Sequence, residues 1–158
     1  MKAVLAAVVA ATCACTVVRK DPGEGAARPD LARELVAMAD ADQDVRRELH
    51  ESLERDKLGN GKAPSVAARL LEVDRRNAER LAEIVDEFGW PDRKLAGEFG
   101  PLAAWIVAQH ADQYPELQQR VLALVEPRIG EGDVAPETFA DLADRVRVAR
   151  GEPQRFGT

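Results

Sequence analysis

The sequence predicts an all-α fold, a single-domain bundle of about five main helices with a central buried helix near 101–114. Apolar residues recur at steps of three and four along most of the chain, which is the period of a helix with one buried face. No stretch of useful length alternates apolar and polar residues as a β-strand would. Short segments rich in proline and glycine separate the helical periods, which is typical of connections between antiparallel helices.

The composition argues against several classes of function. The chain has 158 residues, enough for one domain with a core of its own. Its net charge is -6, and acidic residues are interleaved with the basic ones, so we do not expect nucleic acid as a partner. The chain has no phosphate-binding glycine loop and no Gly-x-Ser-x-Gly motif. Ser52 and Ser65 both lie in surface-like contexts, so no covalent nucleophile is evident.

The sequence also predicts no metal and no other cofactor. Both cysteines lie within the first 15 residues, and the only histidines are His50 and His110, which argues against a zinc site with four ligands. A carboxylate-rich site formed by Asp42, Asp74 and His110 is a weaker alternative. It lacks the Glu-x-x-His pairs of helical di-iron proteins.

The N-terminus has the organisation of an export signal. A positive start at residues 1–2 precedes an apolar run over 3–11 and small residues over 12–15. Cys15 resembles the acylated cysteine of bacterial lipoproteins, although two of the positions before it depart from the usual residues. Plain secretion is the alternative to lipidation, and a buried N-terminal helix or a wrongly assigned start is the alternative to export.

These features divide the chain into an export signal at 1–18, a linker rich in proline and glycine at 19–29 and a helical domain at 30–158. We therefore expect an exported protein, either secreted or held at the cell envelope by a lipid on Cys15. The apolar N-terminal run is shorter than the roughly 20 residues that span a bilayer.

The first two predicted helices each carry one polar residue on an apolar face. The first helix covers about 30–57 with Asp30 as its cap, and the second is capped by Ser65 and ends at Phe88. Asp42 interrupts the first face, and its neighbour one turn on, Arg46, favours a surface salt bridge. Asn77 interrupts the second face, where an asparagine often fixes helix register.

The predicted central helix is apolar on all sides, which is typical of a buried helix. It carries three polar residues near its end: Gln109, His110 and Asp112. At about 100° per residue, His110 and Asp112 point about 200° apart and cannot pair within a helix. We therefore expect His110 to find its partner on another helix or at Tyr114.

The remaining helices are predicted from proline positions. Pro115 begins one helix that stops near Glu126, and Pro136 begins the last helix, which ends before Gly151. Asp144 lies away from the apolar face of that last helix, so periodicity predicts a surface residue. The tail 152–158 has no period, and its one aromatic residue is expected to fold back onto the domain.

The polar residues that lie on the apolar faces of the predicted helices predict a buried network of hydrogen bonds. Asp42, Asn77 and the Gln109–His110 pair come from three helices, and a bundle brings such faces together. A histidine beside a carboxylate can act as a general acid or base near neutral pH. The alternative is that the network only fixes helix register.

Several motifs resemble an uncharacterised bacterial family, mainly actinobacterial, of small helical domains. They are the Gly-Trp-Pro at 89–91, the Trp-x-x-x-Gln-His-Ala-Asp at 105–112, Asp-Arg-Val at 144–146 and the tail 151–158. The resemblance covers about 35–158. It departs at Phe156, where the family usually has tyrosine, and at Thr158, beyond which many members continue. The resemblance implies that the following are matched family positions: Asp74, Asn77, Trp90, Trp105, Gln109, His110, Asp112, Asp144, Arg145 and Gln154.

We predict a helical domain with a polar pocket around His110 that binds a small ligand or an envelope protein. The alternative is a hydrolase- or transferase-type enzyme in which His110 is the general acid or base and Asp42 or Asp144 orients it; a structural scaffold is the second alternative. An open His110 ring with a carboxylate within about 3 Å would favour the enzyme. The predicted ligand-binding residues are Asp74, Asn77, Trp90, Trp105, Gln109, Asp112, Arg145 and Gln154, with Trp90 as a lid on the core in the alternative reading.

Overall fold

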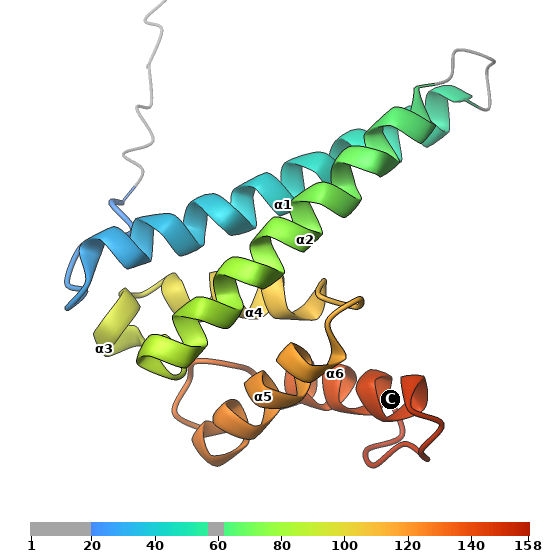
Figure 1. Cartoon of the computed structure of the whole chain (residues 1–158). Coiled ribbons are helices and arrows are strands. Elements are labelled where there is room, and N and C mark those ends of the chain that lie inside the picture. The colour runs from blue at the N-terminus through green and yellow to red at the C-terminus, as the bar shows by residue number, and fades with distance from the viewer. Residues whose placement is uncertain (1–19, 57–61) are drawn as a thin grey trace, which may run out of the picture.

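The computed structural model describes residues 20–56 and 62–158, and within these ranges the fold is all-α, as predicted (Figure 1). The predicted export signal and the lipidation site at Cys15 lie outside the described residues. Along these described residues, six α-helices and one short 3-10 helix follow one another. They are α1 (Pro29–Asp56), α2 (Ala63–Phe88), α3 (Arg93–Ala96), α4 (Gly100–Gln109), α5 (Pro115–Val125), η1 (Glu126–Arg128) and α6 (Pro136–Ala149).

The two long helices, α1 and α2, form an antiparallel hairpin, and the other helices pack at one end of it (Figure 1). Helix α4 contacts α1, α2, α3 and α5, so it lies in the middle of the molecule. Helices α5 and α6 pack on each other on the side of α4 away from α1. This order of packing brings the end of α4 against the middle of the hairpin.

Helix α4 is the predicted central helix, and most of its residues are buried. It ends at Gln109, however, and not near residue 114 as the sequence predicted. Pro115 cannot lie in a helix continuous with α4, because its ring would clash with the carbonyl of Ala111 and its nitrogen carries no proton, and it also disfavours helical geometry at Tyr114. The chain therefore turns between His110 and Tyr114, and Pro115 begins α5.

Two predicted helix caps are wrong for a related reason. Helix α1 begins at Pro29, so Asp30 lies inside its first turn and is exposed. Helix α2 begins at Ala63 with Pro64 in its first turn, and the Ser65 hydroxyl donates to the carbonyl of Lys62 at 2.8 Å. A proline suits the first turn of a helix because its missing proton would have had no partner there.

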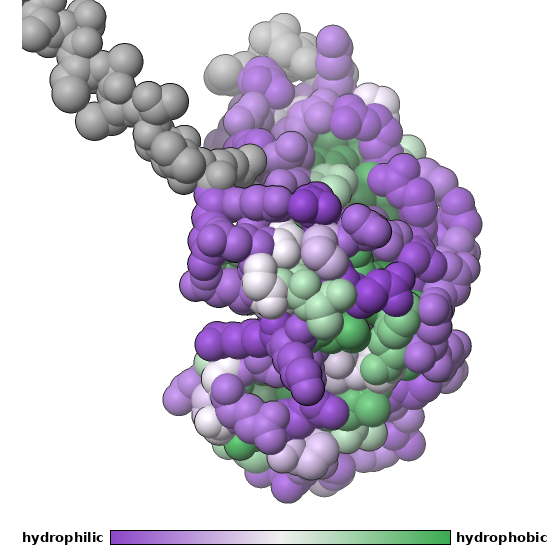
Figure 2. All heavy atoms as spheres, turned by 90° about the vertical axis from the view of Figure 1, so that its left-hand side faces the viewer, coloured by the Kyte–Doolittle hydropathy of each residue, from purple (hydrophilic) through white to green (hydrophobic). Residues whose placement is uncertain are grey.

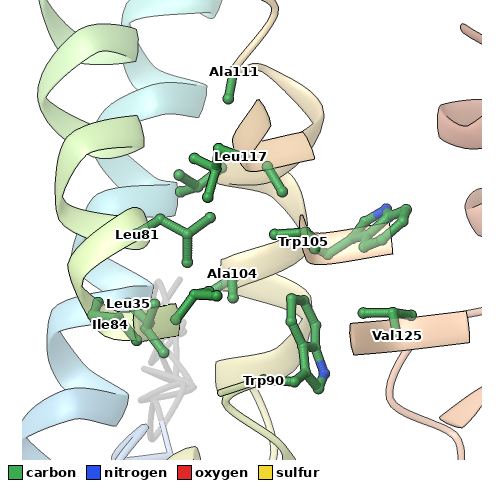
Figure 3. Close-up of a cluster of buried hydrophobic side chains, with 14 of the residues drawn as sticks. Leu35, Leu81, Ile84, Trp90, Ala104, Trp105, Ala111, Leu117 and Val125 are labelled. Carbon is green, nitrogen blue, oxygen red and sulfur yellow. The ribbon is translucent and has the colours of Figure 1, made fainter. Parts of the chain in front are cut away.

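The core contains a run of aromatic rings that joins α4 to α6. The Trp105 ring lies 6.4 Å from that of Trp90 in an edge contact and 6.5 Å from that of Phe139 in a stacked contact, measured between centroids. Trp90 is 2% exposed and Trp105 is 1% exposed. Figure 3 shows both indoles beside Val125 and near the leucines of the hairpin, so both tryptophans belong to the core.

The surface is mostly hydrophilic, with apolar side chains grouped in one area of the face that Figure 2 shows. A groove of about 450 Å³ also lies between α1 and α4. Its apolar lining comes from Val36, Ala39, Phe99, Leu102, Ala103 and Ile106. In the described ranges, no helix combines the length and the apolar character needed to cross a membrane.

Candidate functional site

Asp42 is the buried centre of a polar cluster between α1, α2 and the end of α4. It is 1% exposed, although the sequence predicted a surface salt bridge. Its carboxylate accepts hydrogen bonds from Nε of Arg46 at 3.1 Å and from Nε2 of Gln43 at 2.8 Å. The ring of His110 covers the same carboxylate, with Nδ1 at 2.8 Å from Oδ2 and 2.9 Å from Oδ1. The pair with Arg46 exists, but packing of α4 on α1 buries the acidic partner.

His110 directly follows Gln109, the last residue of α4, and its ring contacts Asp42 on α1 from this position. Burial raises the pKa of Asp42, but the hydrogen bond from His110 and the charges of His110 and Arg46 outweigh burial and hold that pKa below its usual value. Asp42 is therefore ionised at neutral pH.

An ionised Asp42 decides which nitrogen of His110 carries the proton. Nε of Arg46 lies 3.1 Å from Nδ1 of His110, but it also donates to Asp42, and an ionised carboxylate accepts from both groups. The proton of the neutral ring is thus on Nδ1, and Nε2 has a free lone pair. Among the described residues, none forms a hydrogen bond with Nε2.

Arg46 connects this pair to a second carboxylate on α2. Its Nη2 donates to Oδ1 of Asp74 at 2.7 Å. Burial raises the pKa of Asp74, Asp42 raises it further, and the positive charge of Arg46 offsets only part of the rise. Two carboxyl groups that share one guanidinium group therefore have pKa values shifted in opposite directions. Such a difference is typical of sites that transfer protons.

A pocket of about 150 Å³ opens beside this cluster, between α1, α2 and the turn that follows α4. The His110 side chain is 27% exposed, and that of Asp74 is 18% exposed. Asp42 lies behind the pocket and does not line it. The pocket is lined by Arg46, Leu71, Asp74, Arg75, His110, Asp112, Gln113 and Tyr114.

The structure brings together only part of the predicted network. Asn77 is buried, and its Nδ2 donates to the carbonyl of Met38 at 3.0 Å, so it ties α2 to α1 away from the pocket. Gln109 contributes its carbonyl group, which accepts from Nη2 of Arg145 at 2.5 Å. The prediction of convergence is therefore right for Asp42 and His110, and wrong for the other two residues.

The turn after α4 is held by residues that face away from the pocket. Nε2 of Gln118 donates to the carbonyl of Ala108 at 3.1 Å and to Oδ1 of Asp112 at 3.3 Å. Arg145 lies 3.8 Å from the same Asp112 oxygen. Gln118 is 4% exposed, and sequence reasoning did not place it in the site. These contacts join the turn that carries His110 to α5 and α6.

Asp144 lies elsewhere and does not contact His110. It is 1% exposed, so the surface position predicted from periodicity is wrong. The C-terminal tail covers it: its carboxylate accepts from the backbone nitrogens of residues 155–158 at 2.6 to 3.1 Å. Gln154 donates to the carbonyl of Thr158 within the same tail. Trp90 and Trp105 are also remote from the pocket lining.

Five pocket residues were absent from the predicted site: Arg46, Leu71, Arg75, Gln113 and Tyr114. Periodicity gives no signal for the turn residues, because the turn has no period. Arg46 could have been found from its spacing of one helical turn from Asp42. In the described part of the chain, no group of three or more histidine, cysteine, aspartate and glutamate side chains is arranged to hold a metal ion.

The fold and the site define a small all-α domain with a buried Asp–His pair at the edge of a polar pocket. The chain belongs to a family of unknown function, DUF6624, whose family model matches residues 29–158. Comparison with curated proteins and with solved structures gave no match.

Proposed function

We propose that this domain is an enzyme that binds a small polar molecule in the pocket and uses His110 as its general base and acid. The observation that carries the proposal is the 2.8 Å contact between Nδ1 of His110 and the buried Asp42. Because this contact uses Nδ1, the Nε2 atom of His110 has no hydrogen-bond partner among the described residues, and His110 lines the pocket. This combination is the one expected of an enzyme, whereas a sealed network without a cleft would favour a scaffold.

Each residue of the cluster has a role in this proposal. Asp42 orients the ring and stabilises the imidazolium that forms when Nε2 takes a proton. Arg46 holds Asp42 and Asp74 in place from one guanidinium group. The residues that line the pocket include no serine, threonine, cysteine or lysine. In this proposal the nucleophile is water or a group of the substrate, activated by His110.

A small activated ester, 4-nitrophenyl acetate, tests general-base catalysis without knowledge of the natural substrate. We expect the full chain to hydrolyse it faster than buffer, and His110→Gln to lower that enzymatic rate roughly hundredfold, the usual contribution of general-base catalysis. His50→Gln is the matched control, because His50 is exposed on α1 and does not line the pocket. Equal rates for the two variants would refute the proposal.

The protonation of His110 can be measured in the same protein. Long-range proton–nitrogen NMR spectra should show the neutral ring of His110 with its proton on Nδ1, because Asp42 accepts there. His50, which is exposed, supplies the reference signal in the same spectrum. A His110 ring protonated on Nε2 would leave no base facing the pocket.

We also propose that the protein is exported and that Cys15 is its lipidation site, on the sequence of residues 1–18. Globomycin, which blocks lipoprotein signal cleavage, should make a larger precursor accumulate in bacteria that express the full chain. Cys13→Ser should behave in the same way, and Cys15→Ser should not respond to the inhibitor. The absence of a shift in the natural sequence would exclude the lipid anchor and leave plain secretion.

A further inference from the structure

The pocket around His110 offers hydrogen-bond acceptors to a ligand, and both guanidinium groups of its lining are already paired with carboxylates. Arg46 donates from Nε to Asp42 and from Nη2 to Asp74. Arg75 donates from all three of its nitrogens, at 2.7 to 3.0 Å, to Glu72 and Glu79. This pairing offsets the positive charge that each guanidinium group would offer to an anionic ligand.

The ring of His110 and the carboxylates of Asp74 and Asp112 each present to the pocket an acceptor atom that has no partner among the described residues. These atoms are Nε2 of His110, Oδ2 of Asp74 and Oδ2 of Asp112. The first has a free lone pair because Asp42 holds the ring proton on the other nitrogen. The other two belong to carboxylates whose Oδ1 atoms accept from Arg46 and Gln118 respectively. A ligand that donates hydrogen bonds can therefore satisfy these acceptors.

The carboxylate of Asp74 also favours a cationic ligand. It lines the pocket, is only 18% exposed, and has a second carboxylate, that of Asp42, behind it. Arg46 is shared between these two acidic groups, so one guanidinium group faces two carboxylates. A partly buried carboxylate in this setting is stabilised in its ionised form by an added cation.

We propose that the pocket binds a primary amine in its ammonium form, with Asp74 and His110 as its two main partners. This proposal rests on the proposed function and names the class of its substrate. One ammonium proton is donated to Asp74 and another to Nε2 of His110. Leu71 and Tyr114 provide an apolar side wall for a short carbon chain, and the volume of about 150 Å³ limits the ligand to a few carbons.

The proposed contact leads directly to a proton transfer. When His110 accepts the proton, the N–H bond of the ammonium group breaks and an Nε2–H bond forms on the ring. The positive charge moves from the ligand to the imidazolium, beside the buried Asp42. The amine then holds a free electron pair and is a nucleophile. No other reactant is needed for this step.

The experiment titrates the full chain with n-propylammonium chloride and, separately, with sodium propionate at matched ionic strength. The two probes share a three-carbon chain and differ in charge and in donor character. The ring NMR signals of His110 report binding, with those of His50 as the reference. We expect saturable shifts with the amine, with a Kd in roughly the millimolar range for so small a ligand, and none with propionate.

Asp74→Asn should weaken amine binding by at least about fivefold, because it removes the ionic partner. Glu87→Gln, an exposed site on the same helix and outside the pocket lining, should leave the Kd unchanged. No saturable shift with the amine, stronger binding of propionate, or equal affinity in the two variants would each overturn the amine proposal. Ester hydrolysis that depends on His110 would, in those cases, leave the proposed general base intact.

Discussion

Asp42→Asn is expected to lower the free energy of unfolding of the full chain by about 2–3 kcal/mol. Three donors share this buried carboxylate: Nδ1 of His110, Nε of Arg46 and Nε2 of Gln43. An amide of the same shape keeps one oxygen acceptor, but its NH₂ group then faces donors. Arg46 retains Asp74 as a partner, so the loss stays below that for a fully orphaned buried charge. Urea unfolding monitored by circular dichroism measures the change.

Asp44→Asn is the matched control for this measurement. Asp44 lies on the same helix, and its ion pair with Arg47 is exposed, with side-chain exposures of 67% and 64%. Removal of an exposed pair should change the free energy of unfolding by about 0.5 kcal/mol or less. An equal loss of stability in the two variants would show that the buried hydrogen bonds of Asp42 do not stabilise the fold more than an exposed ion pair does.

The stability of the natural chain should also depend on pH through Asp42. Its pKa is lower in the folded state than in the unfolded chain. The stabilisation is therefore present above the unfolded value, near pH 4, and is lost as the pH falls through the folded value. Asp74 has the opposite sign: its pKa is raised, so its contribution to stability is present below the unfolded value and is lost as the pH rises through the folded value. Asp42→Asn should remove the first dependence and weaken the second, because the charge of Asp42 is one cause of the raised pKa of Asp74.

Asp144→Ala is expected to release the C-terminal tail from α6. The carboxylate accepts from four consecutive backbone nitrogens, those of residues 155–158, and from the hydroxyl of Thr158. Without it those donors lose their shared partner, and Phe156 loses the backbone bonds that hold its ring against Phe139. Amide hydrogen exchange of 155–158 should become faster by about tenfold or more, and the thermal unfolding midpoint should fall by several degrees.

The control for the tail is Asp141→Ala. Asp141 lies on the same helix and is exposed, so its removal should change neither amide exchange in the tail nor the unfolding midpoint. Burial raises the pKa of Asp144, but the four backbone bonds outweigh it and lower that pKa well below its usual value. Release of the tail in the natural chain should therefore begin only as the pH falls below the usual carboxyl range. Equal exchange rates in the two variants would show that the tail does not depend on Asp144.

The helices themselves could be predicted because their signals are local. Apolar residues at helical spacing located α1, α2, α5 and α6, and prolines at 115 and 136 gave the correct starts of the last two helices. Proline positions also indicate the correct starts of the first two helices, because Pro29 and Pro64 lie in the first turns of α1 and α2. The predicted caps Asp30 and Ser65 are therefore inconsistent with the prolines beside them. The end of α4 at Gln109 could not be predicted in the same way, because Pro115 disfavours helical geometry at Tyr114 and not at Ala111.

The site was only partly predictable, because its geometry depends on contacts between distant residues. Asp42 and His110 were recognisable as polar residues on apolar segments, but they are 68 positions apart, and their pairing depends on how α4 packs on α1. The turn that directs His110 exists because a helix could not continue. Asn77 had the same sequence signal as Asp42 but bonds to the Met38 carbonyl, and no local rule separates the two outcomes.

The sequence by itself determined the helical class, most helix boundaries and the polar residues that needed buried partners. Those properties depend on apolar period and on proline geometry, which act within a few residues. Only the tertiary structure decided that Asp42 meets His110 beside a pocket and that Asp144 is covered by the tail. The physical reason is that burial belongs to the assembled fold: a carboxylate on a helix surface becomes a buried anchor when another segment, here the end of α4 or the tail 155–158, brings donors to it.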